Sequence, residues 1–118
     1  MKLVVLVSGN GSNLQALIDN GYDIKLVISN KKNAYAIKRA EKAGIMVIIN
    51  EYVKNSDNRE SYDSRLIYLI NTFGFRNTES DFLIVCAGFM RIVSKYFTDY
   101  FKNKIINLHP ALPGMYPG

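Results

Sequence analysis

The only histidine of the sequence ends an apolar run, two positions after an asparagine. Residues 105–110 read IINLHP, and side chains two apart on a strand share a face, so Asn107 and His109 would lie together. An imidazole with a pKa of about 6.5 can give or take a proton near neutral pH, and an amide can donate to a developing oxyanion. A lone histidine is more often structural, but this one stands beside a matching amide where a strand would end. We therefore regard Asn107 and His109 as a candidate catalytic pair; without a second histidine or a cysteine cluster, the sequence predicts no metal site.

A glycine-rich segment near the N-terminus is a candidate anion-binding loop. Residues 8–13 read SGNGSN and stand between an apolar run and a helical pattern. Glycines let a backbone approach a ligand closely, and the first turn of a helix offers free N–H groups at its positive end. The pattern favours a phosphate held by Gly11, Ser12 and Asn13, and a tight turn that binds nothing is the alternative.

A dinucleotide fits this segment less well. The pattern G-x-G-x-x-G would require a third glycine at position 14, where the sequence has Leu14. Residues 29–32 read SNKK and supply no carboxylate to hold a ribose diol after the second strand. A monophosphate site is therefore preferred over an NAD-binding module.

A third segment, 88–93, reads GFMRIV and follows the apolar run 82–87. A glycine followed by apolar residues and an arginine could form a slot for a flat ring. Simple packing of the loop explains the same residues equally well. On its own, this segment does not decide between the two.

These segments need a framework that brings them together, and the rest of the sequence predicts one. Apolar runs rich in Val and Ile, typical of strands covered on both faces, occupy 3–7, 24–28, 46–49, 82–87 and 105–108. Helical patterns alternate with them, which predicts an α/β fold: a doubly wound, Rossmann-like parallel sheet with strand order 3-2-1-4-5 in a single domain over 1–118. Ligands of such sheets bind where the winding reverses, here between the first and fourth strands.

Four helices are predicted between the runs from their end signals. These signals are a helix start with a capping box at Ser12, a possible N-cap at Asn33 with a stop at Gly44, a cap over 57–60 closed by Glu60, and a start near Ser94. The third helix would bury one face, formed by Tyr62, Leu66, Leu69, Ile70 and Phe73. The fourth would pack its aromatic side chains into the core rather than around a ligand: Tyr96, Phe97, Tyr100 and Phe101.

Composition limits the class of protein. A chain of 118 residues, 48% of them hydrophobic, fits one compact domain with its own core. No apolar run approaches the roughly 20 residues of a membrane span, and the N-terminus lacks a signal-peptide pattern. The single cysteine, Cys86, lies in an apolar run and is expected to be a buried small hydrophobe rather than a nucleophile. These features favour a cytoplasmic protein.

The net charge of +5 does not by itself indicate a nucleic-acid partner. Lys and Arg are scattered along the chain, with no cluster beyond 31–32 and no recognised nucleic-acid-binding motif. Attraction to an anionic small molecule explains the charge equally well. We therefore expect small-molecule substrates as partners, with no nucleic acid and no membrane.

Together, the three segments resemble the folate-dependent formyltransferases, and most closely the members that act on phosphoribosylglycinamide. Residues 5–16 are similar to the family's phosphate-binding start, 87–94 to its folate-contacting loop, and 107–110 to its Asn-x-His-Pro. The resemblance covers essentially all 118 residues, in order. It implies transfer of a formyl group from 10-formyltetrahydrofolate, the co-substrate, to the amine of phosphoribosylglycinamide during purine synthesis, without a metal.

The resemblance also implies roles for individual residues. Gly11, Ser12 and Asn13 would hold the phosphate end of the ribonucleotide. Asn107 would orient the formyl oxygen and stabilise the oxyanion, and His109 would act as the general acid or as a proton shuttle. The residues that would contact the folate are Arg59, Met90, Arg91, Ile92 and Val93, together with Asn107.

The family pattern extends beyond Gly118 with further strands and an aspartate that pairs with the catalytic histidine. We therefore expect a formyltransferase fold truncated at its C-terminus, in which strand 105–108 is an edge that invites self-association. A catalytically silent fragment that binds phosphate or folate is one alternative. Methionyl-tRNA formyltransferase and formyltetrahydrofolate hydrolase are the others, although loops 8–13 and 88–91 favour the ribonucleotide enzyme.

Overall fold

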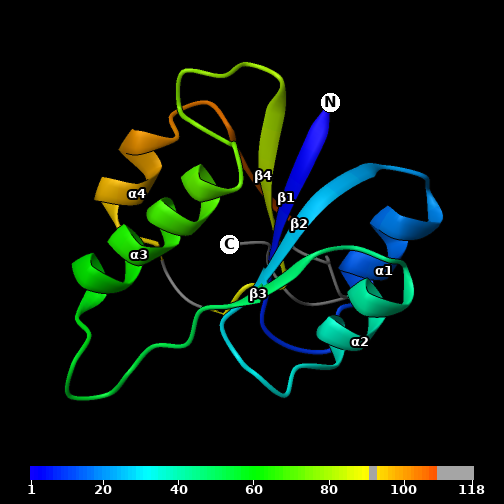
Figure 1. The fold of residues 1–118 in the computed structure, drawn as a ribbon, viewed down its shortest axis with the longest axis horizontal. Coiled ribbons are helices and arrows are strands. Elements are labelled where there is room, and N and C mark those ends of the chain that lie inside the picture. The colour runs from blue at the N-terminus through cyan, green and yellow to red at the C-terminus, as the bar shows by residue number, and fades with distance from the viewer. Residues whose placement is uncertain (91–92, 109–118) are drawn as a thin grey trace, which may run out of the picture.

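The computed structural model describes residues 1–90 and 93–108. Five strands of this part form one parallel sheet in the order β3-β2-β1-β4-β5, which confirms the predicted α/β topology (Figure 1). β1 lies at the centre, paired with β2 on one side and β4 on the other. In chain order the strands are β1 (Lys2–Val7), β2 (Asp23–Ser29), β3 (Val47–Ile49), β4 (Phe82–Ala87) and β5 (Ile105–Leu108).

Helices cover both faces of the sheet (Figure 1). They are α1 (Ser12–Asp19), α2 (Tyr35–Lys42), α3 (Arg59–Thr72) and α4 (Lys95–Tyr100). α1 and α2 contribute Leu14 and Ala36 to one hydrophobic core, whereas α3 and α4 contribute Leu66 and Phe97 to a second. The sheet separates these two cores, which is why its strands are apolar on both faces. None of the helices in the described chain is long and apolar enough to cross a membrane.

Two predicted N-caps are wrong. α1 has Gly11 at its N-cap and no side-chain cap, so Ser12 is the first helical residue rather than the capping one. α2 begins after Ala34, again without a side-chain cap, and Asn33 lies one position too early. A tertiary contact acts at both helix starts: the backbone N–H of α2 residue Ala36 donates to the carbonyl of Gly9 at 3.0 Å. The residues around each helix start carry no information about that contact, so it cannot be predicted from local capping signals.

The cap of α3 is displaced by one residue from the prediction. Asn58, not Asp57, caps the helix: its side chain accepts from the Ser61 N–H at 2.8 Å, and the Ser61 hydroxyl accepts from the Asn58 N–H at 2.9 Å. The carboxylate of Asp57 is bound instead by Arg65. The predicted start of α4 near Ser94 is confirmed, and the Ser94 hydroxyl caps the helix by accepting a backbone N–H of the first turn at 3.3 Å.

Gly44 ends α2, as the sequence predicts. It has a φ of +74°, and its N–H donates to the carbonyl of Glu41 at 3.0 Å. The next N–H, of Ile45, donates to the carbonyl of Ala40 at 2.9 Å. This pair of bonds is a Schellman motif, which turns the chain sharply from α2 toward β3.

The predicted core face of α3 is confirmed in its first three turns. Tyr62, Leu66 and Ile70 are buried, whereas Leu69 is only partly buried. The prediction is wrong at Phe73, which is the C-cap residue and 40% exposed, because the helix ends before another full turn. Ile67 is buried as well, so the apolar face is broader than expected.

The aromatic side chains of α4 pack largely as expected. Phe97 and Phe101 are buried, and Tyr100 packs against the same core with its ring 4.8 Å from that of Phe101. Tyr96 is the exception, since it is exposed on the outer face of the helix. The rings of Phe97, Tyr100 and Phe101 therefore form core, not a ligand box.

Candidate active site

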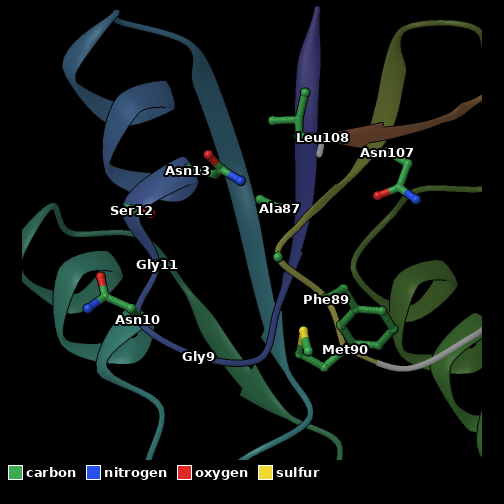
Figure 2. Close-up of a pocket in the computed structure, with 11 residues that line it drawn as sticks. Gly9, Asn10, Gly11, Ser12, Asn13, Ala87, Phe89, Met90, Asn107 and Leu108 are labelled. Atoms are coloured by element: carbon green, nitrogen blue, oxygen red, sulfur yellow. The ribbon is translucent and has the colours of Figure 1, made fainter. Parts of the chain in front are cut away.

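A pocket of about 360 Å³ opens at the carboxyl edge of the sheet (Figure 2). It is lined by residues 9–13, 87–90 and 107–108, which belong to three different strand ends. The strand register explains why they meet: Cys86 of β4 lies beside both Leu6 of β1 and Asn107 of β5. The three adjacent strands end at the same level, so the convergence predicted from the sequence is confirmed for the described residues.

The anion loop, which we define as residues 9–13, requires glycine at position 11. Gly11 has a φ of +85°, and a Cβ there would lie 2.7 Å from the Cα and Cβ of Ala36. Its carbonyl accepts the first bond of α1, from the Gln15 N–H at 2.8 Å. The N–H groups of Ser12 and Asn13 precede this bond and are not capped by a side chain. The loop therefore presents free backbone donors at the positive end of α1.

Arg39 of α2 holds the anion loop in place. Its Nε–H donates to the Asn10 carbonyl at 2.8 Å, and its Nη2–H donates to Asn10 Oδ1 at 2.9 Å. Its Nη1–H donates to Gln15 Oε1 at 3.2 Å. Nothing in the sequence marks Arg39, because only the fold brings it back to Asn10 across 29 positions.

The β4 loop, which we define as residues 88–90, is tied to the end of β1. The hydroxyl of Ser8, only 1% exposed, accepts the Met90 N–H at 2.6 Å. Phe89 is half-buried against the α3–α4 core, while Met90 is 75% exposed at the pocket. The ring of Phe89 and the thioether of Met90 together form an apolar wall of the pocket (Figure 2). Ser8 belongs to the glycine-rich segment singled out in the sequence, but nothing in the sequence indicates its bond to Met90.

Asn107 enters the pocket from β5 (Figure 2). Its side chain is exposed, and its amide has no hydrogen-bond partner within the described ranges. The neighbouring side chains alternate as predicted, with Ile105 packed on the α3–α4 core and Leu108 on the α1–α2 core. The amide is therefore free to donate to an oxygen of a ligand.

A charged cluster fixes the segment that leads into α3. Arg65 donates to both carboxylate oxygens of Asp57, at 3.0 and 2.8 Å, and also to Asn50 Oδ1 at 2.6 Å and the Glu51 carbonyl at 2.9 Å. The hydrogen bonds from Arg65 hold the pKa of Asp57 well below its usual range, and Asp57 in turn raises the pKa of Arg65. Asp57 is therefore a structural anion, not a proton donor.

Cys86 lies in β4 beneath the pocket. It is 6% exposed, and burial raises the pKa of its thiol to about 11. The thiol stays protonated near neutral pH and packs in the α3–α4 core, which confirms that Cys86 is a small hydrophobe. No group of three or more His, Cys, Asp or Glu side chains among the described residues is arranged to hold a metal ion.

The sequence also matches a known family throughout. The model of the formyl transferase family aligns with residues 1–118. The chain belongs to this family. The three segments that line the pocket therefore occur within one formyl transferase domain.

Three relatives of this formyl transferase, two proteins and one solved structure, show which known proteins it resembles. Phosphoribosylglycinamide formyltransferase of Escherichia coli K12 is 40% identical over 100% of the chain and 55% of that protein. The trifunctional purine biosynthetic protein adenosine-3 of Drosophila melanogaster is 39% identical over 99% of the chain and 9% of that protein. A crystal structure of phosphoribosylglycinamide formyltransferase from Campylobacter jejuni has a TM-score of 0.81 and 39% identity, over 100% of the chain and 62% of that structure. The chain thus spans a little over half of the E. coli protein.

The formyl transferase fold brings most of the described candidate residues together. Gly11, Ser12, Asn13, Met90 and Asn107 all line one pocket. They come from the loops after β1 and β4 and from β5, as the strand order predicts.

The remaining candidates are placed differently or are not described. Arg59 is exposed in the first turn of α3 and does not line the pocket. Val93 packs against the α3–α4 core instead. Arg91, Ile92 and His109 lie outside the described residues.

Proposed function

We propose that this formyl transferase chain transfers a formyl group from 10-formyltetrahydrofolate to the amine of phosphoribosylglycinamide in purine biosynthesis. The observation that carries the proposal is that the uncapped start of α1 and the free amide of Asn107 line the same pocket. The names of the relatives support this pair of substrates. Residues 1–118 would be the N-terminal, nucleotide-binding domain of the enzyme.

The ribonucleotide would bind through its phosphate at the anion loop. The backbone N–H groups of Gly11, Ser12 and Asn13 are the donors, and the helix dipole favours a negative charge there. No acidic side chain lies in the first turn of α1 to compete with the phosphate. This end of the pocket would thereby fix the orientation of the substrate amine.

The folate would bind on the opposite side of the pocket. Phe89 and Met90 supply the apolar wall there, and Arg91, Ile92 and Val93 continue the chain from it. Arg59, exposed at the start of α3, would reach a carboxylate of the folate as a charge-assisted contact. In this arrangement the formyl group lies between the two sides, next to Asn107.

This arrangement supports the following chemistry, in which the role of His109 is taken from the family resemblance. The amine nitrogen attacks the formyl carbon, a C–N bond forms, and the carbonyl oxygen becomes an oxyanion. Asn107 donates to that oxygen, an interaction that contributes on the order of 10²–10³ in rate when made by a single donor. The C–N bond to the folate then breaks, and His109 protonates the departing nitrogen, while the amine loses one proton; general acids of this kind contribute roughly 10²–10⁴.

We also propose a setting for the protein. Its partners are small-molecule substrates in the cytoplasm, with no nucleic acid and no membrane, and the folate is a co-substrate with no metal required. β5 is the outer strand of the described sheet, and Ile106 on it is 41% exposed. Such an edge pairs readily with another strand, so the chain would self-associate through β5.

Formyl transfer from 10-formyltetrahydrofolate to phosphoribosylglycinamide by the purified chain tests the function. Asn107→Ala should lower kcat on the order of 10²-fold, because one oxyanion donor is lost. Asn33→Ala is the matched control, since Asn33 is exposed and caps no helix. His109→Ala should also abolish most of the turnover.

A folded wild-type chain without turnover would contradict the proposal. So would turnover that is equally fast in Asn107→Ala and Asn33→Ala. Circular dichroism of each variant separates loss of chemistry from loss of fold.

A further inference from the structure

Arg39 holds the proposed anion loop through hydrogen bonds. Its guanidinium makes three hydrogen bonds, two to Asn10 and one to Gln15, at 2.8, 2.9 and 3.2 Å. The guanidinium also lies over the ring of Tyr35, with Cζ 4.9 Å from the ring centroid. A planar fork used in this way fixes both the backbone and the side chain of Asn10. Figure 2 shows Asn10 on the α2 side of the loop, away from Asn107.

The contact extends to the glycine at the helix start. A Cβ at Gly11 would lie 3.1 Å from Cδ of Arg39 as well as 2.7 Å from Ala36. The stem of Arg39 therefore packs directly beside the N-cap of α1. Loss of this side chain would therefore remove part of the surface on which the loop rests, just before the N–H groups of Ser12 and Asn13.

The charge of Arg39 is not neutralised by its partners. All three acceptors, a backbone carbonyl and two side-chain amides, are uncharged. Within the described chain, no carboxylate lies within ion-pair distance of Arg39, and the first carboxylate in the network is Asp19, reached only through Gln15. A half-buried cation with neutral partners keeps its field, and this field adds to that of the α1 dipole.

We propose that Arg39 is a positioning residue for the phosphate of the ribonucleotide. It orients the anion loop through Asn10 and adds a positive charge behind it, without touching the reacting groups. The inference rests on the proposed function, because it assigns the anion loop to the phosphate. It also separates the two substrates: Arg39 serves the α1 side of the pocket and not the β4 loop.

Three variants test this. Arg39→Gln removes the charge and the fork and should raise KM for phosphoribosylglycinamide roughly 3- to 30-fold, with kcat and the KM for the folate within about twofold of wild type. Arg39→Lys restores the charge without the fork and should recover part of the loss. Lys38→Gln is the matched control, because it removes an equal charge from the exposed side of the same helix and should leave all three constants unchanged.

Two measurements do not depend on turnover. Amide exchange at residues 9–13 of the free chain should be faster in Arg39→Gln and nearly normal in Lys38→Gln, because the loop loses its clamp. Titration with inorganic phosphate, followed by NMR at Ser12 and Asn13, should give a weaker affinity in Arg39→Gln. The dependence of that affinity on salt should also be shallower, because one charge is missing.

The outcomes distinguish the two proposals. Normal exchange together with unchanged phosphate affinity in Arg39→Gln would overturn the role of Arg39 while leaving formyl transfer intact. A kcat loss equal to the KM change, or an equal effect on both substrates, would also overturn it. Faster loop exchange and weaker phosphate binding, in a chain that transfers no formyl group, would support Arg39 as the positioning residue and reject the proposed reaction.

Discussion

The hydroxyl of Ser8 accepts the backbone N–H of Met90 at 2.6 Å, a bond that joins positions 82 apart in the sequence. Ser8 directly follows β1 and precedes the anion loop, whereas Met90 lies in the β4 loop. One short bond therefore connects the phosphate side of the proposed site to its folate side. The spacing of the two loops depends on a serine that touches neither substrate in the proposed arrangement.

Ser8→Ala should loosen the β4 loop. The Met90 N–H would lose its partner, at a cost of about 1 kcal/mol in the free energy of unfolding. We expect a higher KM for the folate, because the apolar wall is no longer held at its place, and urea denaturation with substrate kinetics measures both effects. Ser64→Ala, at an exposed position of α3, is the control; equal effects of the two variants would refute the coupling.

Gly11→Ala should be more destabilising than Gly21→Ala. Both glycines have positive φ, +85° and +78°, so both substitutions introduce backbone strain of roughly 1–2 kcal/mol. Only at Gly11 does the new Cβ collide with Ala36, whereas nothing lies within 4 Å at Gly21. The collision should add roughly 1–3 kcal/mol, as overpacking does. Chemical denaturation of the two variants gives the difference directly, and similar values would show that the loop shifts away without penalty.

The Asp57–Arg65 pair should make stability depend on acid. The folded pKa of Asp57 lies below its unfolded value of about 3.9, so the pair stabilises the fold above that pH and loses its contribution as the pH falls below it. The difference in melting temperature between wild type and Asp57→Asn should therefore be constant from about pH 7 to pH 5 and shrink below about pH 4. Asp99→Asn breaks an exposed pair and should change little at any pH. A difference that grows on acidification would contradict this assignment.

Cys86 should be unreactive in the folded chain. Burial and a pKa raised to about 11 leave almost no accessible thiolate at pH 8. Labelling with a thiol-specific disulfide reagent should proceed only as fast as the chain opens, and should be rapid and complete in urea. Fast labelling without denaturant would mean that the β4 region opens readily.

Self-association through β5 should respond to a charge on its outer face. Ile106→Lys places a lysine on the edge strand, where charges oppose strand pairing. Sedimentation should show a smaller average mass for Ile106→Lys than for wild type at equal concentration. Tyr68→Lys, on the exposed face of α3, is the control. A wild-type chain that stays monomeric at high concentration would contradict self-association through β5.

The strands could be located in the sequence because each is short, apolar and bounded by clear signals, and their order could be predicted because they alternate with helices. Glycine at 44 and serine at 94 ended and began helices as expected, since those signals act through neighbouring backbone groups. The start of α1 was predicted correctly at Ser12, but its N-cap could not be read in this way. The N-cap is Gly11, which closely approaches Ala36, a contact between segments 25 positions apart in the numbering.

The candidate site, too, could be predicted only where it does not depend on contacts between distant segments. Glycine-rich and amide-bearing motifs drew attention to residues 9–13 and to Asn107, which line the pocket, because the chemistry that such motifs suggest depends on the residues themselves. Ser8 and Arg39 act through hydrogen bonds to distant backbone groups, and a serine or an arginine at those positions has many other uses. Only coordinates distinguish these uses.

The division of the interior into two cores has a consequence for how such a protein can change. α1 and α2 share no buried core residue with α3 and α4, because the sheet lies between them. Each layer can accept new side chains without repacking the other. If α1 and α2 of this chain were replaced by those of a relative, the preference for the proposed ribonucleotide should therefore follow the new helices. Recognition of the proposed folate should remain that of the original chain.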